Sequence, residues 1–244
     1  MKKLFKRIFL VHKCVGCRKI LDHNDFDEAF CPSCRELYLS AKMEICPECS
    51  HEAEKCRCMP PFLEKDKAVS LRRLFFYSKI RSREPQNRLI YYFKRNKNKR
   101  ISRAIAAELI PLIKVEAARL KVEELPVIVS APRSHSAVFE YGFDQADMIC
   151  SAISEISAFE YCKVLKRRHG GKIQKALTAG ERRKNIKDLI YADEDERQLI
   201  KGRTVILIDD IVTTGATMSA CTQILKKCGA KNIVCIAIAS DIKT

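Results

Sequence analysis

The stretch VILIDDIVTTGATM at residues 205–218 places two carboxylates, three threonines and one glycine between an apolar strand and a helix. We expect Asp209 and Asp210 to end a central strand, and TTGAT to form the turn into the next helix. Backbone N–H groups and the helix dipole favour an anion at such a turn, and Gly215 allows close backbone approach. The hydroxyl donors there are Thr213, Thr214 and Thr217.

The two acids would repel a phosphate bound at this turn. They should therefore face something else, either the hydroxyls of a ribose or a divalent cation. A phosphate site beside a site for a sugar diol describes a ribose 5-phosphate. Neither G-x-x-x-x-G-K-[ST] nor G-x-G-x-x-G occurs, which argues against an ordinary nucleotide triphosphatase or a dinucleotide enzyme.

Eight cysteines near the N-terminus, in CVGC, CPSC, CPEC and CRC, form a second chemical group. A C-x2-C turn directs two sulfurs at one point, and two such turns complete the tetrahedral site that zinc prefers. The segment is poor in large apolar residues, so metal in place of a core explains it better than a redox dithiol. The predicted structural zinc ligands are Cys14, Cys17, Cys31 and Cys34 for one ion, and Cys46, Cys49, Cys56 and Cys58 for another.

The second of these sites is the less regular because it ends in C-x-C, and His51 is an alternative ligand. Sequential pairing of the turns is simplest, yet an interleaved arrangement uses the same sulfurs. The five remaining cysteines are scattered singly through apolar segments, where a free thiol packs as a small hydrophobe.

Composition is typical of a soluble globular protein. The 244 residues are 47% hydrophobic, and no apolar run reaches the roughly 18 residues of a membrane span. The N-terminal IFLV patch is too short for a signal peptide, and thirteen cysteines without a disulfide pattern suit a reducing compartment. We therefore expect a cytoplasmic protein. A net charge of +16 favours a polyanionic partner, although a lysine-rich surface also serves solubility.

The elements that position these groups follow from periodicity. After a proline pair near residues 59–66, the chain is strand-like at LRRLFFYSKI and helical over residues 86–120, with a break at NKNK. Beyond residue 127, apolar strands alternate with amphipathic helices, which indicates a parallel sheet covered on both faces. We predict a zinc module over residues 1–60 and an α/β domain over residues 61–244, with ligands at the carboxyl ends of the strands.

Two basic segments are candidates for binding anions. Lysines and arginines surround YYF at 91–93, whose rings either stack nucleobases or pack in the core. The stretch KRRHGGKIQKALTAGERRKN at 166–185 lacks periodicity and suits a mobile arm. That arm would be a lid over pyrophosphate, a nucleic-acid contact or an unstructured loop. Its candidate ligands are Arg167, Arg168, Lys172, Arg182 and Arg183.

The stretch VILIDDIVTTGAT resembles the phosphoribosyl-pyrophosphate (PRPP) signature of type I phosphoribosyltransferases. Nearly the whole chain is similar to the ComF family of competence-associated proteins, which have an N-terminal cysteine-rich zinc module, a segment like RLIYYFKRNKN and a P…RGFNQ element. Here that element reads YGFDQ, with Tyr141 where the family usually has Arg and Asp144 where it has Asn. Both departures make the element less suited to an anion. The family's basic stretch is matched by Arg168, Gln174, Leu177, Glu181, Arg182 and Asn185.

The resemblance implies that Asp209 and Asp210 bind the ribose hydroxyls and act in catalysis. The residues implied to bind the 5-phosphate are Thr213, Thr214, Gly215, Ala216 and Thr217. Pyrophosphate would lie on the loop VSAPRS, at Ala131 and Arg133, with Mg²⁺ bound to the PRPP. The chain would transfer phosphoribosyl to an acceptor that the sequence leaves open. The alternative is a non-catalytic module of DNA uptake that binds single-stranded DNA and competence-machinery proteins.

Overall fold

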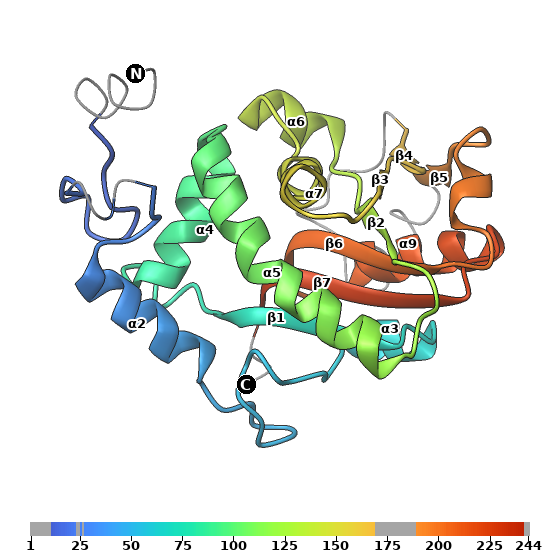
Figure 1. Ribbon diagram of the computed structural model, residues 1–244, viewed down its shortest axis with the longest axis horizontal. Helices are drawn as coiled ribbons and strands as arrows, with labels where there is room; N and C mark the ends of the chain where they lie inside the picture. The colour runs from blue at the N-terminus through green and yellow to red at the C-terminus, as the bar shows by residue number, and fades with distance from the viewer. Residues whose placement is uncertain (1–10, 23–24, 26, 169–188, 242–244) are drawn as a thin grey trace.

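The computed structural model describes residues 11–22, 25, 27–168 and 189–241 (Figure 1). Its N-terminal part holds two cysteine-bearing loops, one on each side of helix α2 (Pro32–Lys42), and leads through the short helix α3 (Pro61–Lys65) into the sheet. Both helices begin at a proline, which is favourable at the first helical position because no N–H is lost there.

A five-stranded parallel sheet in the order β1-β7-β6-β2-β3 forms the centre of the molecule. β6 and β7 are buried along nearly their whole length, as expected for strands covered on both faces. The predicted α/β fold with a parallel sheet is confirmed. The strands are β1 (Ser70–Tyr77), β2 (Val127–Ser130), β3 (Tyr161–Cys162), β6 (Thr204–Val212) and β7 (Asn232–Asp241).

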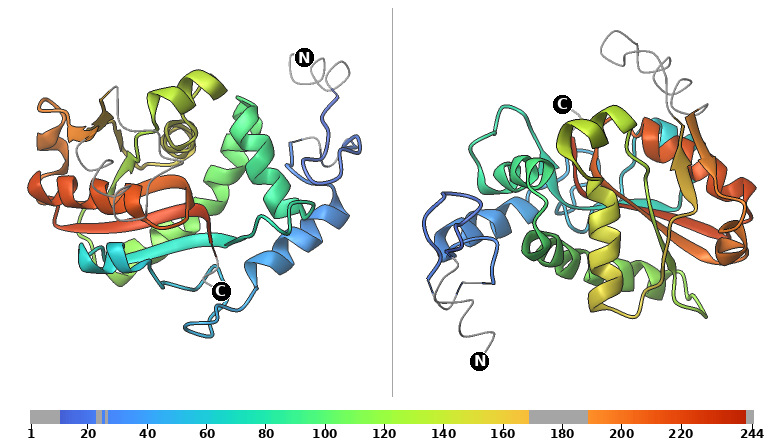
Figure 2. Two further views of the ribbon diagram at one scale, coloured as in Figure 1. Left: turned by 180° about the vertical axis from the view of Figure 1, so that it is seen from behind. Right: turned by 90° about the horizontal axis from the view of Figure 1, so that it is seen from above.

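Helices cover both faces of this sheet, as the views from the front (Figure 1) and from behind (Figure 2, left) show. One face carries α4 (Pro85–Arg95), α5 (Lys99–Arg119) and α7 (Gln145–Ile156), and the other carries α3 and α9 (Ala216–Lys227). Successive residues of a strand point to opposite faces. Ile206 and Ile208 accordingly pack with the first set of helices, whereas Val205 and Leu207 pack with the second.

The helical stretch predicted over residues 86–120 is divided at the expected break. α4 ends at Arg95 and α5 begins at Lys99, with the Asn98 side chain accepting hydrogen bonds from the first N–H groups of α5. The helices α2 and α3 were not predicted, and neither were the short helix α6 (His135–Tyr141) and the 3₁₀ turn η2 (Arg197–Ile200). The last two give little signal in the sequence. Neither has an extended apolar period, and α6 buries no residue fully.

The stretch CKVLKR, residues 162–167, belongs to two short strands. β3 pairs with β2 of the main sheet, whereas β4 (Leu165–Arg167) pairs antiparallel with β5 (Ile190–Ala192). The predicted basic arm therefore connects the two strands of an antiparallel ribbon, and the Arg168 N–H donates to the Leu189 carbonyl at 2.8 Å. Most of the arm, including Lys172, Arg182 and Arg183, lies outside the described residues.

The cysteine-bearing segment shares a hydrophobic core with the sheet. Phe30 and Tyr38 pack with residues of β1, α4 and α5, and the Tyr38 and Phe75 ring centroids are 5.8 Å apart. A boundary at residue 60 remains a prediction. Among the described residues, no helix is long and apolar enough to cross a membrane.

Candidate functional site

Asp209 and Asp210 lie inside β6, so the prediction that they end this strand is wrong by two residues. Ile211 and Val212 continue the ladder, opposite Ala239 and Ser240 of β7. β7 is long enough to pair with these two residues in the sheet, and sequence periodicity does not reveal the length of a partner strand. The connection to α9 is consequently a tight turn over residues 213–215.

The two acids differ in their surroundings. Asp210 Oδ2 lies 3.6 Å from Lys94 Nζ and 3.5 Å from an Arg133 guanidinium nitrogen, and the Asp210 side chain is 13% exposed. Burial and the neighbouring charge of Asp210 raise the pKa of Asp209 well above its usual range. The Asp210 backbone N–H donates to Asp209 Oδ1 at 2.8 Å. Asp210 is therefore paired with two cations, whereas Asp209 is affected by burial and by the carboxylate next to it.

Gln145 joins the two cations that flank Asp210. Its side chain is fully buried, its Nε2 donates to the Lys94 carbonyl at 3.0 Å, and its Oε1 accepts from the Arg133 guanidinium. The Arg133 guanidinium also lies over the Tyr141 ring, 5.0 Å from its centroid. The YGFDQ element therefore fixes the arginine that the sequence predicted to hold pyrophosphate.

Asp144 stands where the family pattern usually has Asn, and its side chain accepts two backbone hydrogen bonds. Its Oδ2 accepts from the Arg133 N–H at 3.0 Å and its Oδ1 accepts from the Asp147 N–H at 3.2 Å, which caps α7. A carboxylate offers both oxygens as acceptors, whereas an amide offers one. Burial raises the pKa of Asp144. The two departures from the family pattern thus position the 131–134 loop and its arginine.

The predicted phosphate turn leads directly into α9. Gly215 has φ +74°, in the left-handed region that favours glycine. A Cβ at this position would lie 3.1 Å from Cβ and Cγ of Pro60. The missing side chain of Gly215 therefore makes room for Pro60 of the same chain. Ala216 N–H donates to Thr214 Oγ1 at 3.4 Å. The turn and the first residues of α9 thus present N–H groups and hydroxyls beside the acids.

The loop that follows β2 lies next to the acids. The Ala131 N–H donates to the Ile208 carbonyl of β6 at 2.8 Å, and Ser134 caps α6 through a bond from the Ala137 N–H. The structure therefore brings together three predicted groups at the carboxyl ends of neighbouring strands. They are the acids, the phosphate turn and the 131–134 loop.

Two members of the predicted basic arm are described, and they differ in their surroundings. Arg167 is half-buried at the end of β4, where burial lowers its pKa while the charge of Asp209 opposes that shift. The guanidinium of Arg168 lies 5.2 Å from the centroid of the Tyr191 ring on the other strand of the ribbon. Of the two described arm residues, Arg167 is the one that interacts electrostatically with Asp209.

Of the three aromatic residues at 91–93, Phe93 packs in the core, whereas Tyr92 is half-buried and Tyr91 is exposed. Phe93 is 1% exposed, the hydroxyls of Tyr91 and Tyr77 are 3.0 Å apart, and Tyr92 lies beneath the Arg18 guanidinium. Lys94, in the last turn of the same helix, instead reaches Asp210. Sequence reasoning assigned this lysine to a basic segment and missed its place at the acids, because the contact joins elements more than a hundred positions apart.

The predicted zinc ligands form two separate groups, which we call the first cluster (Cys14, Cys17, Cys31 and Cys34) and the second cluster (Cys46, Cys49, Cys56 and Cys58). Within each group all four sulfurs lie within 4.8 Å of one another. The pairing is therefore sequential, not interleaved. His51 is no member of the second cluster, and its Nδ1 lies 2.9 Å from the Cys49 carbonyl. Both clusters could hold a metal ion, and four thiolates are the donor set of structural zinc.

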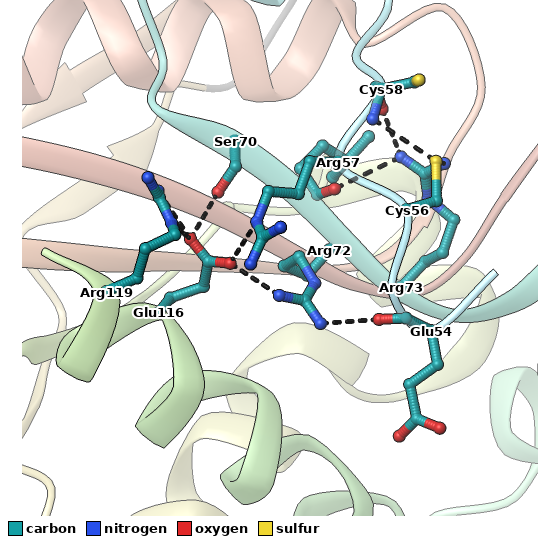
Figure 3. A network of polar contacts seen from close by, with 10 residues as sticks. Glu54, Cys56, Arg57, Cys58, Ser70, Arg72, Arg73, Glu116 and Arg119 are labelled. Carbon is teal, nitrogen blue, oxygen red and sulfur yellow. Dashed lines mark hydrogen bonds and ion pairs between the residues drawn. The ribbon is translucent and has the colours of Figure 1, made fainter. Parts of the chain in front are cut away.

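Buried charges attach the second cluster to the sheet (Figure 3). Arg73 of β1 donates to Cys56 Sγ at 3.1 Å and to the Cys58 carbonyl, and Arg72 donates to the Glu54 carbonyl at 2.6 Å. Arg72 also binds Glu116 of α5, whose side chain is fully buried.

Glu116 gathers three arginines from three segments of the chain (Figure 3). Burial disfavours its ionised form, but hydrogen bonds from the arginines outweigh that effect and lower its pKa from 4.5 to about 2. The three partners are Arg57, Arg72 and Arg119. This carboxylate thus links the end of the second cluster to β1 and α5.

Comparisons with known proteins agree with this arrangement. The model of the family described as "Phosphoribosyl transferase domain" matches residues 153–244. Competence protein F of Haemophilus influenzae is 27% identical over 232 residues, which cover 92% of this chain and 95% of that protein.

Two further relatives carry related names. Competence protein ComFC of Streptococcus pneumoniae is 25% identical over 217 residues, 88% of each chain. DNA utilization protein YhgH of Escherichia coli O157:H7 is 28% identical over 151 residues, 61% of this chain and 64% of that protein. The family match and the parallel sheet together establish a phosphoribosyltransferase-type α/β fold.

Proposed function

We propose, from the premise that this chain is a homologue of the ComF competence proteins with a phosphoribosyltransferase domain, that it binds Mg²⁺-PRPP and transfers the phosphoribosyl group. The observation that carries the proposal is the meeting of two adjacent acids, a glycine turn at a helix N-terminus and an arginine loop at one edge of a parallel sheet. Ligands of such sheets bind at that edge.

Each part of PRPP has a chemically matching group. Asp209 and Asp210 would bind the ribose hydroxyls, and residues 213–217 would bind the 5-phosphate with backbone N–H groups and threonine hydroxyls. Arg133 and Lys94, which lie at Asp210 in the described structure, would bind the pyrophosphate. Mg²⁺ would enter with the substrate and neutralise part of the pyrophosphate charge.

The reaction would be a displacement at C1 of the ribose. The bond from C1 to the pyrophosphate oxygen breaks, its electron pair leaves with pyrophosphate, and the acceptor's lone pair forms the new bond to C1. This chain would contribute positioning and charge stabilisation, with no covalent intermediate on the protein. Arg133 and Lys94 would stabilise the leaving group, and Asp210 would keep the ribose oriented.

Calorimetric titration with Mg²⁺-PRPP tests this proposal. The double variant Asp209→Asn with Asp210→Asn should abolish saturable binding while the fold, monitored by circular dichroism, is retained. Asp195→Asn, a change of the same chemistry at an exposed acid in the turn after β5, should bind as the wild type does. Equal affinity of the double variant and the wild type would contradict the ribose assignment.

We also propose that each cluster holds one structural zinc ion. Two Zn²⁺ per chain are expected in the purified protein, and Cys14→Ser should lose one and destabilise the N-terminal segment. Full metal retention by this variant would rule out the ligand role of Cys14. We propose the cytoplasm as the compartment, because a reducing environment keeps such thiols available to metal.

Binding of single-stranded DNA is the second candidate function. The net charge of +16 favours it, as do relatives named for competence and DNA utilization. Competence-machinery proteins are then candidate partners. If the basic arm holds the phosphates, neutralising Arg182 and Arg183 should reduce the slope of log affinity against log salt by about 1 per lost contact. Lys114→Ala, an exposed change on α5, is the matched control. An unaltered slope in the arm variant would place the contact elsewhere.

A further inference from the structure

The phosphate turn rests on the linker that leaves the second cluster. Pro60 is two residues beyond the ligand Cys58, and its Cβ and Cγ lie 3.1 Å from the position that a Gly215 Cβ would occupy. Thr213 of the turn and Cys58 of the cluster line one small cavity of about 40 Å³, together with Pro60. The second cluster and the phosphate turn thus line the same cavity.

Arg73 of β1 holds the start of this linker by hydrogen bonds. It is 3% exposed and anchored in β1 opposite Ala237 of β7. Its guanidinium donates to Cys56 Sγ and to the Cys58 carbonyl and lies 5.4 Å from the Phe76 ring centroid. A cation beside a thiolate both favours the ionised sulfur and orients it, which is the role of groups that surround a metal's ligands.

The end of the same linker is fastened to α9, the helix that begins at the phosphate turn. Asp66 accepts from Ser219 Oγ and, at 2.8 Å, from Gln223 Nε2, and Lys226 Nζ donates to the Asp66 carbonyl at 2.6 Å. Residues 58–66 therefore run from a cysteine ligand, across the glycine of the turn, to the helix behind it. Displacement of Cys58 would move the surface against which Gly215 packs.

We infer that the second cluster positions the phosphate turn, with Arg73 and Pro60 as positioning residues that contact neither the zinc ion nor the bound phosphate. This inference rests on the proposed function in that it takes the occupant of the turn to be the 5-phosphate of PRPP. Metal at the second cluster holds Cys58, Arg73 holds the Cys58 carbonyl, and Pro60 supports Gly215 in its left-handed conformation. Metal occupancy at this cluster therefore sets the affinity of the turn for phosphate.

Hydrogen exchange on the full-length zinc-loaded protein tests the inference without relying on PRPP. Cys58→Ser should lose one of two zinc ions, and backbone amides of residues 213–219 should exchange faster, whereas those of α7 should not change. Its dissociation constant for Mg²⁺-PRPP should rise roughly tenfold or more, as for other losses next to a metal site. Cys228→Ser, at a half-buried cysteine outside both clusters, should keep both ions and exchange like the wild type.

A second variant separates positioning from metal loss. Pro60→Gly leaves all eight ligands in place and should keep both zinc ions, yet it should raise amide exchange at residues 213–219 and weaken Mg²⁺-PRPP binding. A merely structural role would lower the melting temperature without this local change in exchange. Unchanged exchange at residues 213–219 in both variants would overturn the inference, as would two retained zinc ions in Cys58→Ser.

The proposed function can fail separately. Faster exchange in both variants, with no PRPP binding even by the wild type, would support the positioning role and contradict the PRPP assignment. PRPP binding by the wild type, with equal affinity in Pro60→Gly and Cys58→Ser, would support the assignment and overturn the positioning role.

Discussion

The two cysteine clusters share one local geometry but have different neighbours. In the first, the Cys14 N–H donates to the Lys19 carbonyl, and in the second the Cys46 N–H donates to the His51 carbonyl, both at 2.8 Å. Each C-x2-C turn ends at a residue with positive φ, 69° at Arg18 and 58° at Ser50. The first C-x2-C turn of each cluster therefore has the same backbone hydrogen bond and the same positive φ after its second cysteine.

The two clusters are similarly buried, but they contact different parts of the molecule. The first cluster is held to α4 and α5 through backbone carbonyls, with Arg88 donating to Gly16 and Arg100 to Glu28. The second is backed by the buried Arg73 and, through Arg57, by Glu116, and it lies under the phosphate turn. The same set of four thiols thus lies against α4 and α5 in one case and beside the candidate site in the other.

The largest expected effect is on the second-cluster side, at Glu116. Glu116→Gln removes the carboxylate that three arginines share and should lower the free energy of unfolding by about 3–5 kcal/mol. Glu108→Gln is the matched change on the first-cluster side, where Glu108 binds Lys42 and is 35% exposed. It should cost no more than about 1 kcal/mol. If Glu116→Gln and Glu108→Gln lose the same free energy of unfolding in urea, the predicted difference between the two carboxylates is wrong.

The same carboxylate predicts a pH dependence. Its pKa is lowered from 4.5 to about 2, so the stabilisation is complete above the unfolded-state pKa and is lost as pH falls toward 2. The amount is about 3 kcal/mol. Unfolding free energies between about pH 5 and pH 2 should therefore fall less steeply in Glu116→Gln than in the wild type. Parallel curves for the two proteins would show that Glu116 is not the titrating group.

A glycine substitution isolates the contact between linker and turn. Gly215→Ala adds a methyl group at φ +74° and 3.1 Å from Pro60, and it should destabilise the protein by about 1–3 kcal/mol and weaken Mg²⁺-PRPP binding. Gly202→Ala is the control, because Gly202 has φ +75° and no atom within 4 Å of the added carbon. Backbone strain is thus matched, and only the first variant disturbs Pro60. Equal behaviour of both variants would mean that the contact is unimportant.

The smallest expected effect is at the first cluster. Arg88→Met removes the hydrogen bond to the Gly16 carbonyl between the two ligands of the CVGC turn, and it should cost about 1 kcal/mol of stability. Chelator competition should show zinc leaving one site more readily, while amide exchange at residues 213–219 stays at the wild-type rate. Faster exchange there would show that the first cluster also supports the turn.

Local patterns in the sequence predicted most of the sheet and the two cysteine groups, but not the contacts between them. The C-x2-C spacing and the strand–turn–helix at 205–218 are encoded within a few residues, so periodicity and ligand geometry were sufficient. The end of β6 was missed because the partner strand β7, not the local sequence, sets how far the ladder continues.

The roles of Lys94, Arg73 and Pro60 depend on long-range packing. Lys94 meets Asp210 across 116 positions, and Pro60 meets Gly215 across 155. No spacing rule connects such residues. In the sequence, Arg73 is one more charged residue of a strand. Its burial and its hydrogen bond to Cys56 Sγ are visible only in the folded structure.

The most direct test of the account is a phosphorus NMR titration of Mg²⁺-PRPP with the zinc-loaded full-length protein. The account predicts that the signals of the 5-phosphate and of both pyrophosphate phosphorus atoms shift or broaden on binding, and that Arg133→Met abolishes the effect on the pyrophosphate signals while keeping that on the 5-phosphate. Unperturbed signals for the wild type at millimolar ligand would contradict it.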